Sequence, residues 1–188
     1  QRPGETRIDL MGRNVAIFKS IIGGITAHAR DSILLIATNP VDILTQVALK
    51  LSGWPKERVI GSGTLLDSAR FRYLVAEKLR VDPRSIHGFI IGEHGDSEVA
   101  VTSLVQVAGI NPWRSPASER LKLTEADKEE IVQETRSAAY RIIEKKGATY
   151  YAIALALARI SEAILKDQKS VLTVSSYLEN YHGISDVC

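Results

Sequence analysis

An uninterrupted apolar run, Ile33-Leu34-Leu35-Ile36-Ala37, constrains the fold of this chain more than any other feature. Because the run does not alternate with polar residues, it is typical of a strand buried on both faces, as in a parallel sheet covered by helices. Asn39-Pro40 ends the strand, and segments with helical spacing lie on both sides of it. We therefore expect strands and helices to alternate in an α/β unit.

The residues around this run predict the other elements of the unit. Apolar positions at helical spacing precede the run, and glycine marks the end of the next helix. The expected elements are a helix capped by Thr6, a helix from about Val41 to Leu51 ended by Gly53, a strand from Arg58 to Gly61 and a helix from about Thr64 to Leu79.

The pattern changes after Gly61, which predicts a second domain, of α+β type, over residues 62–188. It is expected to begin with two strands, over residues 85–91 and 98–105, on either side of a tight turn at 92–96. A charged helix follows, opened by a capping box of Thr124 and Asp127 and ending near Lys146. After Gly147 we expect an apolar helix over residues 150–166 and a last strand over 171–174. The predicted class is α/β.

Composition and charge exclude several classes of protein. The 188 residues carry 24 basic and 22 acidic side chains, a net charge of +2, and no basic block indicates a nucleic-acid partner. The single cysteine, Cys188, cannot close an internal disulfide, and no Cys/His cluster has metal-ligand spacing. No apolar stretch is long enough to span a membrane. We expect a cytoplasmic protein with no membrane partner and no metal.

His94 is the residue most indicative of chemistry. It lies in the turn between Gly92 and Gly95, with Glu93 and Asp96 as acidic neighbours. Histidine titrates near neutral pH and can exchange a proton there, and a neighbouring carboxylate favours its charged form. The alternative is a solvated turn histidine without a function.

Other polar residues have both a functional and a structural interpretation. Asp67 and Arg70 share one helix face, either as a surface ion pair or with Arg70 gripping a carboxylate in a cleft. Asn39 lies at the carboxyl end of a predicted buried strand, where ligands of open α/β sheets gather. Taken by itself, His87 is typical of a core or interface residue. Arg7, taken by itself, is typical of the start of a helix.

Phosphate-binding motifs are missing from this chain. Gly61-Ser62-Gly63-Thr64 has two glycines of a Gly-x-Gly-x-x-Gly loop, but Leu66 occupies the third position. There is also no P-loop and no Gly-x-Ser-x-Gly nucleophile elbow. We assign no phosphate-binding role to residues 61–64.

Taken together, six segments closely resemble, in content and in order, those of the L-lactate dehydrogenases in the lactate/malate dehydrogenase family, and they extend the resemblance over essentially the whole chain. The segments are Gln1-Arg2-Pro3-Gly4-Glu5-Thr6-Arg7, Ala37-Thr38-Asn39-Pro40-Val41-Asp42, Gly61-Ser62-Gly63-Thr64, Leu66-Asp67-Ser68-Ala69-Arg70-Phe71-Arg72, Gly92-Glu93-His94-Gly95-Asp96 and Gly147-Ala148-Thr149-Tyr150-Tyr151.

The resemblance implies the fold and a role for each matching residue. Residues 1–61 would be the C-terminal part of a doubly wound, parallel-sheet (Rossmann) domain that binds NAD, and residues 1–7 of it would form a closing loop. Residues 62–188 would be an α+β substrate domain that is truncated at its C-terminus. The implied catalytic residues are His94, which exchanges the proton, Asp67, which pairs with it, and Arg7, which polarises the carbonyl. The implied substrate-binding residues are Gln1, Arg7, Asn39, Arg70 and Thr149, and the implied cofactor-binding residues are Ser20, Ala37, Asn39, Ser62 and Ile153.

The residue at position 1 distinguishes lactate from malate in this family. The malate enzymes carry an arginine two residues before Pro-Gly, and this chain has Gln1 there. Oxaloacetate would bring an unpaired carboxylate into a closed site, at a cost of about 3–5 kcal/mol. We expect pyruvate to be preferred by at least about a few hundredfold. A one-residue shift of the loop would present Arg2 instead and favour a malate or other 2-hydroxy acid dehydrogenase.

The resemblance also implies regulation and assembly. Many bacterial relatives bind fructose 1,6-bisphosphate at a subunit interface through an arginine and a histidine that match Arg72 and His87. This would make the protein an allosteric homo-oligomer, with a tetramer implied by the family. The alternative is that both are interface residues without a ligand.

The family's glycine-rich nucleotide loop would precede Gln1, and further strands would follow Cys188. We therefore expect this chain to be the middle and later part of a longer enzyme and to have little or no activity by itself. From a different class, it could be a non-catalytic homologue that kept the fold, although four intact polar site residues argue against this.

Overall fold

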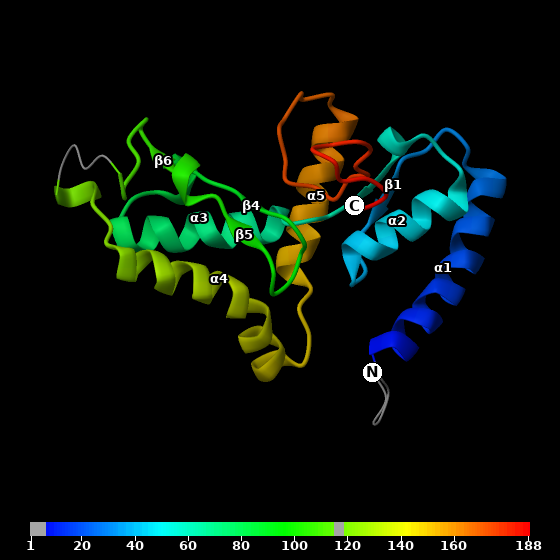
Figure 1. Cartoon of the computed structure of the whole chain (residues 1–188), viewed down its shortest axis with the longest axis horizontal. Coiled ribbons are helices and arrows are strands. Elements are labelled where there is room, and N and C mark those ends of the chain that lie inside the picture. The colour runs from blue at the N-terminus through cyan, green and yellow to red at the C-terminus, as the bar shows by residue number, and fades with distance from the viewer. Residues whose placement is uncertain (1–6, 115–118) are drawn as a thin grey trace. The chain divides into compact units, whose positions relative to one another are not determined.

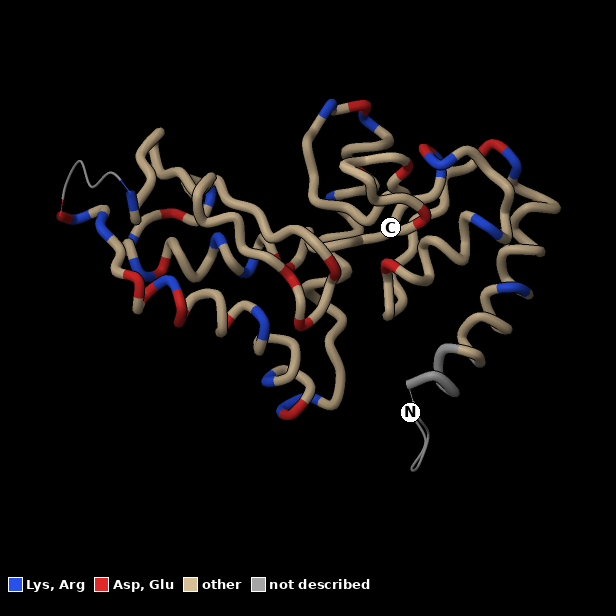
Figure 2. The backbone as a smooth tube through the Cα atoms, viewed as in Figure 1, with Lys and Arg blue, Asp and Glu red and all other residues tan. Residues whose placement is uncertain are grey.

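The computed structural model describes residues 7–114 and 119–188, with no account of the side chains of residues 7–11 and 13. The chain forms two compact units, one of residues 1–61 and 174–188 and the other of residues 62–173 (Figure 1). Both units contain helices and strands, as the predicted α/β class requires. Basic and acidic residues are interspersed along the described chain (Figure 2), in keeping with the small net charge.

The first unit is built on the predicted buried strand. β1 (Leu34–Ile36) pairs in parallel with β2 (Val59–Gly61), and the helices α1 (Arg7–His28) and α2 (Val41–Ser52) pack against each other beside them. Apolar side chains from all four elements form one core. The expected alternation of strands and helices is confirmed, and Thr6, the expected cap of α1, lies outside the described residues.

The prediction of a last strand over residues 171–174 is wrong. These residues have no strand conformation, and the pairing begins one residue later, where Ser175 forms an isolated antiparallel bridge with Gly61. The two residues exchange both backbone hydrogen bonds, at 2.8 and 3.0 Å. A β-branched, apolar composition favours an extended backbone, but a strand also needs a neighbour that continues the ladder.

The second unit places small antiparallel pairs beside three helices, α3 (Leu65–Leu79), α4 (Glu125–Lys146) and α5 (Tyr151–Leu165). β3 (Ile86–His87) pairs with β6 (Gln106–Val107), and β4 (Ile90–Ile91) pairs with β5 (Val99–Ala100). Phe71 and Val75 of α3 are buried at the centre of its core, against Ile86, Ile90 and Val105.

The two strands expected over residues 85–91 and 98–105 are each interrupted. The first breaks at Gly88, where an added Cβ would lie 3.2 Å from both Phe71 Cε1 and Val105 Cγ2. The second gives way to a 3₁₀ turn over Thr102–Leu104 before β6 begins. One predicted hairpin is therefore observed as two short pairs, with little room for a side chain at Gly88 beside Phe71.

Local signals predicted the helix ends of this unit correctly. Thr124 and Asp127 form the expected reciprocal capping box at the start of α4, and Gly147, at φ +77°, ends the helix. None of the helices in the described ranges combines the length and the apolar character that crossing a bilayer requires.

Candidate active site

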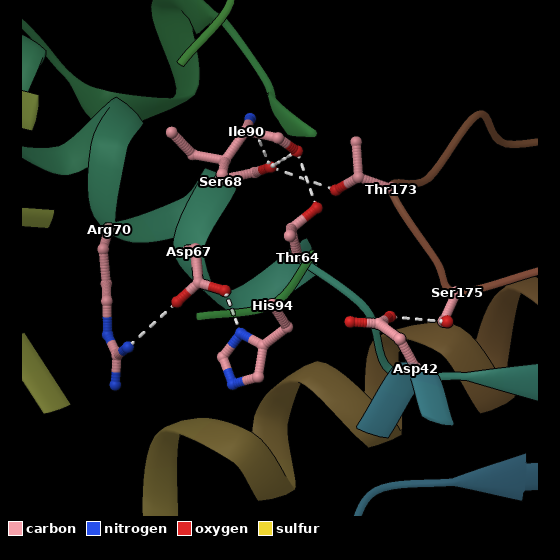
Figure 3. A network of polar contacts seen from close by, with 9 residues as sticks. All are labelled: Asp42, Thr64, Asp67, Ser68, Arg70, Ile90, His94, Thr173 and Ser175. Atoms are coloured by element: carbon pink, nitrogen blue, oxygen red, sulfur yellow. Dashed lines mark hydrogen bonds and ion pairs between the residues drawn. The ribbon is translucent and has the colours of Figure 1, made fainter. Parts of the chain in front are cut away.

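Asp67 is the centre of a polar cluster in the second unit. Its side chain is only 4% exposed, and it accepts hydrogen bonds from two neighbours. Arg70 Nη1 lies 3.1 Å from Oδ1, and His94 Nδ1 lies 2.6 Å from Oδ2 (Figure 3). The side chain of Arg70 is itself only 15% exposed, so the pair on α3 is not the exposed surface pair that the sequence left open.

The turn that carries His94 is attached to α3 through the strand that precedes it. Thr64 donates a hydrogen bond to the carbonyl of Ile90 at 2.6 Å, and Ser68 accepts one from the Ile90 amide at 2.9 Å (Figure 3). Gly92, at φ +85°, then reverses the chain. Because Thr64 and Ser68 flank Asp67 along the same helix, these bonds place His94 over the carboxylate.

A second helix holds the far side of the same turn. Arg136 and Tyr140 are one helical turn apart on α4 and therefore share a face. Arg136 Nη2 donates to the carbonyl of Glu98 at 2.7 Å, and the Tyr140 hydroxyl donates to Asp96 at 3.0 Å. The segment from His94 to Glu98 is thus fixed between α3 and α4, which limits the orientations open to the imidazole.

Glu98 is the residue in this cluster that sequence reasoning missed. It is 3% exposed, and its Oε1 atom has no hydrogen-bond partner. Burial, and then the charge of Asp67, raise the pKa of Glu98 to about 7. Its position four residues after His94, in the same turn, was a signal that could have identified it.

The donor atoms of Asp67, His94 and Glu98 lie within 4.8 Å of one another, close enough to hold one metal ion. The charges of Arg70 and Arg136 act on this same cluster, and both oppose the binding of a cation. We assign no metal to these three residues.

Arg70 and Thr149 line the same cavity, of about 480 Å³, between α3, α4 and the segment before α5. Its wall is mostly apolar, and Arg141, Lys145 and Lys146 are further basic residues among those that line it. A cavity with several cations and one threonine hydroxyl suits a small anionic ligand. The structure therefore brings together two of the predicted substrate-binding residues.

The other predicted site residues are spread over both units. Ala37 and Asn39 follow β1, and Asn39 is exposed and precedes Pro40 through a cis peptide bond. Ser20 is exposed on α1. Ser62 is buried directly after β2, and Ile153 is half-buried on α5. Gln1 lies outside the described residues, as does the side chain of Arg7, whose backbone begins α1.

The two residues expected to bind an effector lie close to each other. Arg72, on α3, donates to the carbonyl of Gly88 at 3.3 Å, and Gly88 directly follows the exposed His87 of β3. Burial lowers the pKa of the Arg72 guanidinium. Arg72 thus contacts the backbone one residue after His87.

Parallel strands between helices, together with a part-buried aspartate–histidine pair, define an α/β protein with a candidate active site. Residues 1–61 match the model of the lactate/malate dehydrogenase NAD-binding domain, and residues 64–188 match that of the lactate/malate dehydrogenase alpha/beta C-terminal domain. The chain belongs to the lactate/malate dehydrogenase family.

Individual relatives agree with this assignment. L-lactate dehydrogenase from Acetivibrio thermocellus is 56% identical over all of this chain and 59% of its own length. L-lactate dehydrogenase from Streptococcus gordonii is 56% identical, again over the whole chain and 57% of the relative. The structure of a minor L-lactate dehydrogenase from Enterococcus mundtii superimposes with a TM-score of 0.93 at 45% identity, over 100% of this chain and 59% of that one. This chain thus spans less than two thirds of these relatives.

Proposed function

We propose that the protein is an NAD-dependent L-lactate dehydrogenase, which transfers a hydride between NAD(H) and the pair L-lactate and pyruvate. The observation that carries this proposal is the Asp67–His94 pair, with Arg70 on the same carboxylate and at the wall of a cationic cavity. Relatives that cover the whole chain and are named L-lactate dehydrogenase support it.

The described residues fit a nicotinamide cofactor. Ala37 and Asn39 follow the carboxyl end of β1 and Ser62 follows that of β2, which is the edge where open α/β sheets bind their ligands. Ser20 and Ile153 are further proposed contacts. When bound, NADH would supply the hydride that reduces the carbon of the substrate ketone.

The chain's own residues would provide binding and the proton. Arg70 would hold the substrate carboxylate through two parallel hydrogen bonds, with Thr149 beside it. Because His94 Nδ1 is engaged with Asp67, Nε2 is the atom that would donate a proton to the ketone oxygen. Asp67 would stabilise the imidazolium, and Asn39 and Arg7 would offer donors to the developing oxyanion.

Gln1 would select the substrate. A glutamine side chain leaves a second carboxylate without a cationic partner, so pyruvate would be preferred over oxaloacetate. The alternative, a malate or other 2-hydroxy acid dehydrogenase, requires Arg2 to occupy this place. Closure of residues 1–7 would exclude water and strengthen the polar interactions with the substrate.

Regulation and assembly are a further part of the proposal. Arg72 and His87 would bind the phosphates of fructose 1,6-bisphosphate in a homo-oligomer, which we expect to be a tetramer. The hydrogen bond of Arg72 beside His87 supports a shared anion site. A cytoplasmic location also belongs to the proposal.

NADH oxidation by the full-length protein, with matched concentrations of pyruvate and oxaloacetate, tests the proposal. We expect pyruvate to be preferred by at least about a few hundredfold and Gln1→Arg to shift the preference toward oxaloacetate. A preference for oxaloacetate in the unaltered protein would place Arg2 at the substrate. No turnover of either substrate by the folded protein would refute the enzyme assignment.

A further inference from the structure

Glu98 has no part in the mechanism described above, although it lies in the polar cluster that holds His94. Its carboxylate and the ligating atoms of Asp67 and His94 lie within 4.8 Å of one another. The residue is 97% buried, and one of its oxygens has no hydrogen-bond partner. A buried carboxylate with an open acceptor is costly, and a neutral side chain of the same shape would fill the space at lower cost.

We propose that Glu98 is a positioning residue whose carboxylate, second to that of Asp67, sets the pH range over which His94 holds its proton. Only the consequence for catalysis, namely that turnover uses the proton of His94, rests on the proposed function. The electrostatic relation between Glu98 and His94 exists with or without a substrate.

The charged groups that face Glu98 come from three parts of the second unit. α3 contributes Asp67 and Arg70, the turn contributes His94, and α4 contributes Arg136. The two guanidinium groups and a charged His94 favour the ionised form of Glu98, whereas burial and Asp67 oppose it. The opposing effects are larger, so the pKa of Glu98 rises to about 7.

This balance links the protonation of the two side chains. At pH values below its pKa of about 7, Glu98 is mostly neutral, and a protonated His94 faces the negative charge of Asp67. Above this pH Glu98 ionises and adds a second negative charge, which favours the charged form of His94. Since linkage is reciprocal, the imidazolium persists to higher pH than Asp67 alone would allow.

The α4 helix holds Glu98 in place for this role. Arg136 Nη2 bonds the backbone carbonyl of Glu98 at 2.7 Å rather than its side chain, and Arg136 Nε is buried without a partner. The guanidinium thus fixes the backbone without a hydrogen bond to the carboxylate. As a result, the charge of Glu98 is not cancelled by a direct ion pair and can act on His94.

The test measures the reactivity of His94 in the full-length protein without cofactor or substrate. Diethyl pyrocarbonate modifies neutral imidazole, and mass spectrometry of peptides reports the modification of His94 separately from that of other histidines. We expect Glu98→Gln to lower the pH midpoint of His94 modification by about half a unit to one unit, because it removes the second negative charge. Glu130→Gln is the matched control, since Glu130 pairs with Lys78 on the surface, and it should leave the midpoint unchanged.

Two further variants make the result decisive. Glu98→Asp keeps the charge and should stay closer to the unaltered protein than Glu98→Gln does. Glu98→Ser, a smaller neutral residue, gives the same comparison if Glu98→Gln does not fold. The inference would be overturned if the curves of His94 modification against pH were the same for the neutral variants and the unaltered protein. It would also be overturned if Glu98→Asp moved the midpoint as far as the neutral variants do.

Turnover is measured separately, so failure of the proposed function can be distinguished from failure of this inference. If the midpoint moves but the protein oxidises no NADH with pyruvate, Glu98 still governs His94 and the proposed function is wrong. If the protein is active, the pH profile of pyruvate reduction should move in the same direction as the midpoint. If the protein is active but Glu98→Gln changes neither the midpoint of His94 modification nor the pH profile of pyruvate reduction, the proposed function stands and the inference is refuted.

Discussion

Asp67 shows at the scale of single residues how one carboxylate organises two functional groups. Its two oxygens are divided between a guanidinium on its own helix and an imidazole from a turn 27 positions away. Because the side chain is almost fully buried, both interactions are weakly screened. Removal of this charge should therefore affect the binding of the substrate carboxylate and the proton transfer together.

Asp67→Asn tests this expectation with a side chain of nearly the same shape. Breaking a buried ion pair costs about 3–5 kcal/mol, so we expect kcat/KM for pyruvate to fall by at least about a hundredfold. Steady-state NADH oxidation by the full-length protein measures the change. Asp82→Asn, which removes an exposed partner of Arg84, serves as the control and should have little effect. Activity within about threefold of the unaltered protein would show that the Asp67 charge is not needed.

Glu98 should also leave a signature in the pH dependence of stability. Its pKa rises from 4.5 in the unfolded chain to about 7 in the folded protein, so the folded state binds the proton more tightly. This stabilisation is fully present below about pH 4.5 and is lost as the pH rises through 7. The loss amounts to up to about 3 kcal/mol.

Denaturant unfolding at pH 5 and pH 8 measures this contribution. The unaltered protein should lose more stability between these two values than Glu98→Gln does, because glutamine does not ionise. The difference between the two proteins reports the contribution of Glu98 together with its effect on His94, and it cancels those of titrating groups that do not interact with Glu98. Equal losses of stability in the two proteins would mean that the pKa of Glu98 is not raised in the folded protein.

At the scale of elements, the carboxyl end of β2 depends on a residue without a side chain. A Cβ added at Gly61 would lie 2.3 Å from Thr45 Oγ1 and 2.9 Å from Ser175 Cβ. These contacts join β2 to α2 and to the bridge at Ser175 within the first unit. The close approach, rather than an unusual φ, is what requires glycine at this position.

Gly61→Ala should destabilise the protein by about 1–3 kcal/mol because of overpacking. Gly24→Ala is the matched control, since Gly24 lies within α1 with no atom within 4 Å of an added Cβ. That change should stabilise the helix by about 0.5–1 kcal/mol. Chemical denaturation compares the two variants, and losses of equal size and sign would contradict the steric explanation.

The start of α4 depends on the Thr124–Asp127 capping box, in which each side chain bonds the other's backbone amide. Thr124→Ala should cost about 1 kcal/mol, and Thr124→Ser, which keeps the oxygen, much less. Urea unfolding midpoints provide the comparison. An alanine variant as stable as the serine variant would show that the cap contributes nothing.

At the scale of the whole molecule, the proposed effector site would couple assembly to activity. We expect fructose 1,6-bisphosphate to raise turnover at low pyruvate concentration by about tenfold, because it would favour the active arrangement by differential affinity. His87→Ala should abolish this response while leaving activity without the effector unchanged. Kinetics combined with light scattering of the full-length protein tests both activation and oligomeric state. A response that survives in His87→Ala would place the effector elsewhere.

The sequence by itself determined what depends on neighbours along the chain. Gly53 and Gly147 end α2 and α4 as expected, and the spacing of Asp67 and Arg70 correctly placed them on one helix face. An apolar run at 33–37 was enough to predict a strand of a parallel pair. Local spacing carries this information because helix faces, caps and strand burial repeat over only a few residues.

Only the tertiary structure decided which distant residues meet. Gly88 lies where an added Cβ would meet Phe71 of another element, and the bridge of Ser175 to Gly61 joins residues more than a hundred positions apart. The same holds for Glu98, whose burial beside Asp67 makes its carboxylate important. Burial and neighbouring charge, rather than residue type, determine how such a group ionises, and these arise only when separate elements pack together.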